Sequence, residues 1–237
     1  MIVPMIHRML KRDDLARLVA AIAAADPQSA RDAAHKLESG EIDLLLDLPI
    51  ALKAVRGHDG VPGALPLPLL WYVPIRALLR DQGVDDITIA DFAATIPVAF
   101  VSSRSARRFG LGDPALTTWL TSIASLPHGT IVQAERAAYC AALALWWAGC
   151  FPERVESHGG RGMLRAYVDF AAGAFERAAR ILDALEPGTA QVYEEAARKS
   201  IIIYSTLDRA RRDYIGSKAH TPRDKIRRFL KRMGHGE

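Results

Sequence analysis

The sequence holds few residue combinations that could carry out catalysis. It lacks the glycine-rich loops that bind nucleotide phosphates, the paired histidines of zinc proteases and the serine motif of esterases. None of its seven histidines follows a glutamate by three residues, as di-iron helical proteins require. The acidic pairs Asp13–Asp14 and Asp85–Asp86 lack the third carboxylate of a magnesium-binding D-D-x-x-D cluster. We therefore predict no catalytic residue, no metal site and no cofactor; whether the protein is an enzyme stays open, with a preference against it.

A glycine-rich segment at residues 157–162 is a candidate anion site. Its sequence, Ser-His-Gly-Gly-Arg-Gly, precedes a predicted helix, where exposed backbone N–H groups and the helix dipole attract anions. His158 and Arg161 lie within it, and Arg161 adds positive charge. The alternative is a flexible connector whose glycines adopt positive φ, and we favour that alternative.

Basic residues are concentrated near the C-terminus. Residues 207–237 contain ten Lys and Arg against four Asp and Glu, a net charge of +6 that leaves −2 on the rest of the chain. Apolar residues at helical spacing within 222–232 and at Met233 predict a basic amphipathic helix there. The candidate contact residues of this helix are Arg223, Lys225, Arg227, Arg228, Lys231 and Arg232.

Several partners suit such a helix, and they stay open as alternatives. Residues 218–233 fit docking on the protein's own body, an acidic protein partner, a nucleic acid or an anionic membrane surface. Nucleic-acid binding lacks the support of aromatic residues interleaved with the basic ones. The apolar stripe of the same helix is also a candidate seam for a homodimer.

Five large aromatic residues are candidates for the lining of a ligand pocket between helices: Trp71, Tyr72, Trp146, Trp147 and Tyr167. An apolar pocket of this kind is where a small ligand would bind. Packing in the hydrophobic core explains the same residues without any ligand, and we favour it.

Helical periodicity dominates the chain, and evidence for strands is thin. Between residues 163 and 185 the apolar side chains fall within about 60° of one line on a helix. Charged residues on the opposite side, including Asp169 and Arg180, indicate a solvated face. The patterns Thr88-x-x-Asp91 and Thr130-x-x-Gln133 resemble capping boxes and predict helix starts.

These patterns predict an all-α fold. We expect a compact bundle of about eight to eleven helices around a central apolar helix near 130–149. The predicted helices span residues 2–10, 13–25, 27–38, 42–56, 67–81, 89–103, 114–125, 130–149, 162–185, 189–214 and 222–232. A segment rich in Gly and Pro at 57–68 suggests a boundary. It divides the chain into an N-terminal helical subdomain at 1–56, a main domain at 69–216 and a basic tail at 217–237.

No apolar run is long enough to cross a membrane. The longest, Ala137–Phe151, has about 15 residues where a transmembrane helix needs about 20. No basic segment precedes an apolar core at the start of the sequence, so we expect no secretory signal. Cys140 and Cys150 match no disulfide framework or metal-ligand spacing. The cytoplasm is therefore the expected location.

Two segments resemble a group of uncharacterised bacterial all-helical proteins. They are Tyr72–Phe92 and Ala144–Glu153, the latter followed by a helix that carries Tyr167, Gly173 and Phe175. Together they cover about half of residues 70–185. The group has no assigned activity, so the resemblance implies a helical fold and no chemistry.

The preferred hypothesis is a cytoplasmic, non-enzymatic module that binds a partner or regulates one through the basic C-terminal helix. One alternative is a small-ligand-binding protein or enzyme that uses an apolar pocket between helices. Another is a protein that associates with nucleic acid through its basic tail.

Overall fold

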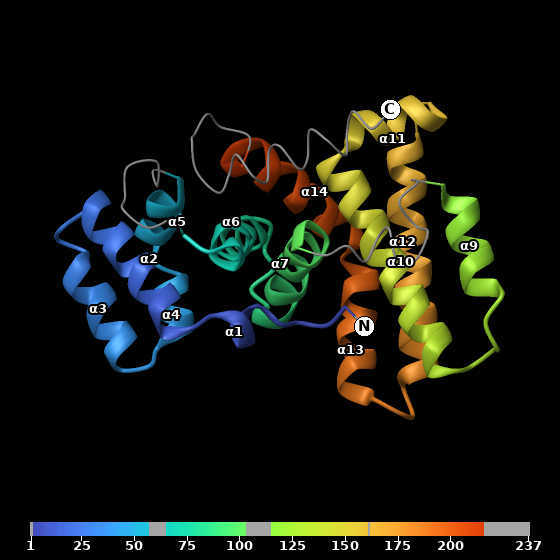
Figure 1. Cartoon of the computed structure of the whole chain (residues 1–237), viewed down its shortest axis with the longest axis horizontal. Coiled ribbons are helices and arrows are strands. Elements are labelled where there is room, and N and C mark those ends of the chain that lie inside the picture. Colours follow the sequence, from blue (N-terminus) through green and yellow to red (C-terminus); the bar gives the residue numbers. More distant parts are fainter. Residues whose placement is uncertain (1, 57–64, 103–114, 161, 216–237) are drawn as a thin grey trace. The chain divides into compact units, whose positions relative to one another are not determined.

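The computed structural model describes residues 2–56, 65–102, 115–160 and 162–215, and every regular element in these ranges is helical (Figure 1). No strand occurs among them, so the predicted all-α class is confirmed. The described residues form thirteen α-helices and a final π-helical turn, more than the eight to eleven helices predicted. The predicted helix at 222–232 lies outside the described residues.

The chain separates into two compact units. One comprises residues 1–4 and 95–208, and the other comprises residues 5–94 and 209–237. We refer to them as unit 1 and unit 2. The predicted division into residues 1–56, 69–216 and 217–237 stays a prediction. The two units divide the chain at other positions, since residues 5–94 belong to one unit.

Unit 2 contains the first six helices and part of the seventh. They are α1 (Ile6–Met9), α2 (Arg12–Ala25), α3 (Ala30–Glu38), α4 (Ile42–Leu46), α5 (Pro49–Arg56), α6 (Leu67–Arg80) and the first half of α7 (Ile87–Ser102). Unit 1 contains the second half of α7, then α9 (Leu116–Ala124), α10 (Ile131–Cys150), α11 (Pro152–Gly159), α12 (Met163–Leu182), α13 (Pro187–Arg198) and most of α14 (Ser200–Ala210). The turn η2 (Arg211–Ile215) follows α14.

Two of the additional helices arise where long predicted helices are interrupted, and a third, α11, forms where no helix was predicted. The predicted helix at 42–56 divides into α4 and α5 because Pro49 disfavours the helical conformation at the residue before it. The predicted helix at 189–214 divides at Lys199, where the backbone reaches φ −103° and ψ 12°. The next residue, Ser200, donates its hydroxyl to the carbonyl of Ala196 at 2.8 Å, a bond that bends helices.

Helix α10 is the most extensively buried of the long helices in unit 1. It packs mainly against α12, and also against α9 and α11. Its side chains are almost all buried from Ala137 to Cys150, with only Tyr139 partly exposed. Many of them are alanines, which let neighbouring helices approach closely. At Gly149 the approach leaves no room for a side chain, since a Cβ built there would lie 2.6 Å from the Cβ of Leu207 on α14.

In unit 2 a buried carboxylate anchors the N-terminal segment. Asp91 on α7 is 5% exposed and accepts hydrogen bonds from the backbone N–H groups of Ile6 and His7, at 2.7 and 3.1 Å. The His7 ring lies between two carboxylates, with Nδ1 2.6 Å from Asp91 and Nε2 2.7 Å from Asp43. The hydrogen bond to Asp91 raises the pKa of His7 above its ordinary value of 6.5, against the opposing effect of burial.

This arrangement corrects one predicted cap. Helix α7 begins at Ile87, and it is Asp86 whose carboxylate accepts from the N–H groups of Thr88 and Ile89, at 2.8 and 3.1 Å. The carboxylate that caps the start of α7 is thus that of Asp86, while Asp91 binds the backbone of the N-terminal segment. Within the described ranges, no helix combines the length and the apolar character needed to cross a membrane.

Candidate functional site

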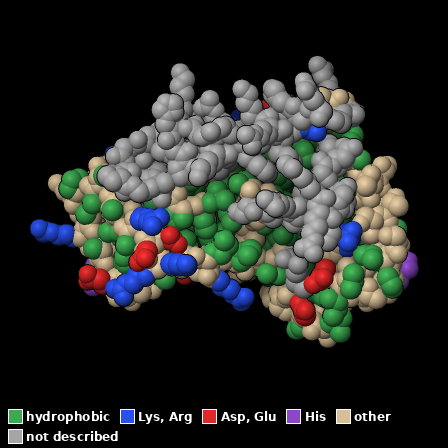
Figure 2. Space-filling view, viewed as in Figure 1, with side chains coloured by type: hydrophobic (Ala, Val, Ile, Leu, Met, Phe, Trp, Pro, Cys, Tyr) green, Lys and Arg blue, Asp and Glu red, His purple; other side chains and the backbone are tan. Residues whose placement is uncertain are grey.

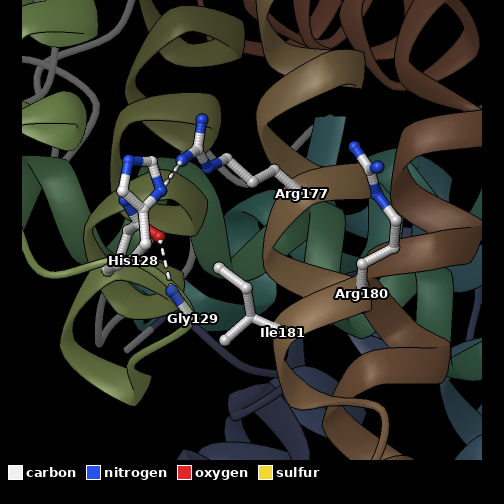
Figure 3. Close-up of a pocket in the computed structure, with 6 residues that line it drawn as sticks. His128, Gly129, Arg177, Arg180 and Ile181 are labelled. Atoms are coloured by element: carbon white, nitrogen blue, oxygen red, sulfur yellow. Dashed lines mark hydrogen bonds between the residues drawn. The ribbon is translucent and has the colours of Figure 1, made fainter.

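The best candidate for a functional site is an open pocket in unit 1 between α12 and the loop that precedes α10 (Figure 3). Its volume is about 550 Å³. The pocket is lined by His128, Gly129, Gln133, Arg177, Arg180 and Ile181. We call it the basic pocket.

Helical spacing brings the two arginines to one side of α12. Arg177 and Arg180 are three residues apart, so their side chains lie on adjacent turns of the same face. The opposite face of α12 is buried, with Phe175, Ala178 and Leu182 among its core residues. Burial of that face therefore directs Arg177 and Arg180 away from the core and into the pocket.

A buried glutamine holds the loop on the other side. Gln133 is fully buried, and its side-chain amide donates to the carbonyls of Ile123 and Leu126 at 3.3 and 3.4 Å. Its side-chain oxygen accepts from the N–H of Gly129 at 3.1 Å. Gly129 has φ +72°, a left-handed conformation that favours glycine. Together these bonds fix the turn that presents His128.

The imidazole of His128 makes direct contact with α12. Arg177 donates from Nη2 to Nδ1 of His128 at 3.2 Å, as Figure 3 shows. Because Nδ1 accepts, a neutral ring carries its proton on Nε2, which is then a hydrogen-bond donor. The pocket therefore presents two guanidinium groups and an imidazole N–H, and all of these groups are donors.

The two arginines of the basic pocket form no ion pair among the described residues. Among the residues that the structure describes, no carboxylate lies within 4.0 Å of Arg177 or Arg180. On the same helix, by contrast, Arg165 pairs with Asp169 at 2.9 Å. Acidic and basic side chains are also interspersed on the surface seen in Figure 2. An anion is the ligand that would complete this arrangement.

A second, apolar pocket adjoins the first. It lies between α9 and α12, has a volume of about 510 Å³ and shares Arg177 with the basic pocket. We call it the apolar pocket. Its lining residues are Leu120, Thr121, Ile123, Ala124, Asp169, Phe170, Gly173, Ala174 and Arg177. One arginine thus stands where a basic and an apolar pocket meet.

The aromatic pocket candidates lie elsewhere and are buried. Trp71, Tyr72, Trp146, Trp147 and Tyr167 are each at most 1% exposed. The first two belong to unit 2 and the other three to unit 1. Their rings contact other side chains, including Phe151, which packs against both tryptophans of α10, and Trp119, which meets Tyr167 edge-on. Neither the basic nor the apolar pocket is lined by them, so their role as pocket residues stays a prediction.

The glycine-rich anion site is only partly visible. Residues 157–159 form the last turn of α11, a helix that we did not predict, and the predicted loop therefore begins later than expected. His158 lies in that turn, but its side chain is not described, and Arg161 lies outside the described residues. The candidate residues of the basic tail, Arg223, Lys225, Arg227, Arg228, Lys231 and Arg232, also lie outside them.

Sequence reasoning missed the residues of the basic pocket. Periodicity places Arg180 on a solvated face, and no motif in the sequence points to Arg177 or His128. The spacing of the two arginines is a local signal, but the histidine comes 49 residues earlier in the chain.

In the described part of the chain, no group of three or more His, Cys, Asp or Glu is placed to hold a metal ion. Burial raises the pKa of the Cys140 thiol to about 12, which leaves it un-ionised.

Comparison with known proteins finds no match to this chain among protein-family models, curated proteins or solved structures. The resemblance to uncharacterised bacterial all-helical proteins therefore stays a prediction. The geometry of the pockets is the remaining basis for an assignment of function.

Proposed function

We propose that this protein is a non-enzymatic binding module whose basic pocket takes a small anionic ligand, with a carboxylate or phosphate group as the recognised chemistry. The observation that carries the proposal is the pair Arg177 and Arg180, which line one pocket without a carboxylate partner among the described residues. The proposal corresponds to the alternative of a small-ligand-binding protein. Its binding residues are the two arginines and not the aromatic residues that the sequence suggested.

The chemistry of the lining supports this choice of ligand. A guanidinium group presents parallel N–H donors that match the two oxygens of a carboxylate or phosphate. Arginines one turn apart repel each other by a few tenths of a kcal/mol, and an anion between them relieves that repulsion. His128 adds a further donor at Nε2. None of the described residues that line the basic pocket is acidic, so none of them repels an anion.

Partner binding through residues 218–233 is a second proposal, supported by the net charge of +6 on residues 207–237. An acidic protein partner, a nucleic acid and a homodimer seam remain its candidates. We place either function in the cytoplasm, following the sequence expectation, and we propose α10 as the central helix of the fold.

A titration with inorganic phosphate and with acetate tests the anion site. The full-length protein, labelled with ¹⁵N, is titrated at constant ionic strength while its backbone amide and arginine Nε–H signals are recorded. We expect saturable shifts at Arg177, Arg180 and Gly129. The double variant Arg177→Gln/Arg180→Gln should lose these shifts at Gly129.

The matched control is Arg198→Gln on α13. Arg198 is also an exposed arginine, but it pairs with Glu194 and Glu195 at 3.0 Å and does not line the pocket. This variant should keep the wild-type response. Shifts that do not saturate, or that persist in the double variant, would overturn the proposal, because they would reflect general salt effects.

A further inference from the structure

We propose that the ligand is an amphiphile, with an oxyanion head in the basic pocket and an unbranched alkyl chain in the apolar pocket. This inference rests on the proposed function, since it extends the same site. The head is a carboxylate or a phosphate, two groups that share their chemistry toward guanidinium.

Arg177 is the first reason to connect the two pockets. It lines both of them, so a group bound by its guanidinium lies at the entrance of the apolar pocket. A small anion would leave that pocket unfilled. An alkyl chain attached to the anion would instead cover apolar side chains that now face water, and such burial is favourable.

The side chains that line the apolar pocket suit an alkyl chain. Leu120 on α9 is 53% exposed, and Phe170 and Ile123 line the same space. The small residues Ala124 and Ala174 also line it. A pocket lined by aliphatic and aromatic groups recognises shape and apolar area, which an unbranched chain supplies.

Charge sets the direction of the ligand. Asp169 and Arg177 both line the apolar pocket and are eight residues apart on α12, about 12 Å along the helix axis. Asp169 is paired with Arg165 at 2.9 Å, so Arg177 is the cation among the described lining residues that has no carboxylate partner. The head therefore binds near Arg177, and the chain extends toward Phe170.

Gly173 is an independent indication that the pocket is kept open. It lies in the middle of α12, where glycine destabilises a helix relative to alanine. Its φ is not in the positive range, and a Cβ built on it meets no atom within 4 Å. Neither backbone conformation nor helix packing therefore requires glycine here. A larger side chain at this position would project into the apolar pocket that Gly173 lines.

Isothermal titration calorimetry on the full-length protein tests the inference with two matched pairs of probes. Acetate is compared with octanoate, and inorganic phosphate with octyl phosphate. Each methylene group buried adds about a factor of four in affinity. We expect each octyl compound to bind at least tenfold more tightly than its short counterpart. The preferred head is the one whose octyl compound binds more tightly.

Two variants test the binding of the head group and the binding of the alkyl chain separately. Gly173→Leu should reduce the affinity for the octyl compounds to that of the short anions, and leave acetate and phosphate unaffected. Gly173→Ala is the matched control, because its methyl group fills little of the pocket. Arg180→Gln should weaken all four probes by a similar factor. Circular dichroism checks that each variant is folded. The open space around Gly173 predicts that both Gly173 variants fold.

The failures of the two proposals are distinguishable. If the short and the long anions bind with equal affinity, the proposed alkyl-chain site in the apolar pocket is wrong, while the proposed anion site in the basic pocket is supported. If none of the four probes binds, both proposals fail. If 1-octanol binds as tightly as octanoate, and Arg180→Gln has no effect, the assignment of the head is overturned. If Gly173→Leu leaves octyl binding intact and dissociates a dimer, the pocket holds a second copy of this chain.

Discussion

Two glycines in long helices of unit 1 should respond in opposite ways to the same substitution by alanine. At Gly149 on α10, the new Cβ would lie 2.6 Å from the Cβ of Leu207 and 3.5 Å from the carbonyl oxygen of Tyr204. A carbon pair is at its optimum near about 3.5–4.0 Å, so the first contact is too short by about 1 Å. Because both atoms are fixed to the backbone, no side-chain rotation relieves it, and α10 must move away from α14.

Two opposing contributions set the change in the free energy of unfolding for Gly149→Ala: the cost of the steric overlap and the gain in helix propensity. Overpacking of a core by one methyl group destabilises by about 1–3 kcal/mol. Alanine recovers at most about 1 kcal/mol, and less at Gly149 because it is the second-last residue of its helix. We expect Gly149→Ala to lower the free energy of unfolding by about 1–2 kcal/mol. Gly173→Ala meets no atom within 4 Å and should raise it by up to about 1 kcal/mol.

Urea denaturation of the wild type and the two variants measures these changes. The denaturation midpoint should fall for Gly149→Ala and rise for Gly173→Ala, with an unchanged dependence of the free energy on urea. If Gly149→Ala is as stable as the wild type, the close approach of α10 and α14 is not what excludes a side chain. If Gly173→Ala is destabilised, the space around Gly173 is filled, and the apolar pocket is refuted with it.

Two further predictions concern unfolding free energies in other parts of the chain. The raised pKa of His7 between Asp43 and Asp91 stabilises the fold fully below about pH 6.5, its unfolded value, and this stabilisation is lost as the pH rises through the folded pKa. The deficit of His7→Gln relative to the wild type should therefore be larger at about pH 5.5 than at about pH 8.5, and a deficit that does not vary with pH would contradict this. Tyr193→Phe removes the buried hydrogen bond from the hydroxyl to the carbonyl of Ile2, 2.9 Å long, and should lower the unfolding free energy by about 1 kcal/mol, measured by urea denaturation. An unchanged midpoint in that variant would show that the bond contributes nothing.

Local sequence patterns determined the class of fold and many helix limits. The pattern at Thr130 and Gln133 predicted a helix start, and Thr130 Oγ1 accepts from the N–H of Gln133 at 3.3 Å. The apolar stripe at 163–185 predicted the buried face of α12. Such features depend on residues within one or two turns of each other, so a single sequence contains the information.

Breaks and caps that depend on context were predicted less well. Pro49 divides a predicted helix, and its effect is local, so the sequence contained that signal. Asp91, by contrast, looked like part of a cap at the start of α7, yet it accepts from the backbone of His7, 84 residues away. Competition between a local and a distant donor is decided by packing, which periodicity does not record.

The sequence by itself therefore determined that α12 has one buried and one exposed face, but not which exposed charges are left without partners. Arg165 and Arg180 each have an acidic residue one turn away in the sequence, Asp169 and Glu176, but of the two arginines only Arg165 forms an ion pair among the described residues, whereas Arg180 lines a pocket. The pocket exists only because Gln133 holds the loop of His128 beside Arg177, across 49 residues. A surface helix encodes its own periodicity, while the groups that neutralise or leave open its charges come from distant segments, and only the tertiary structure brings these segments together.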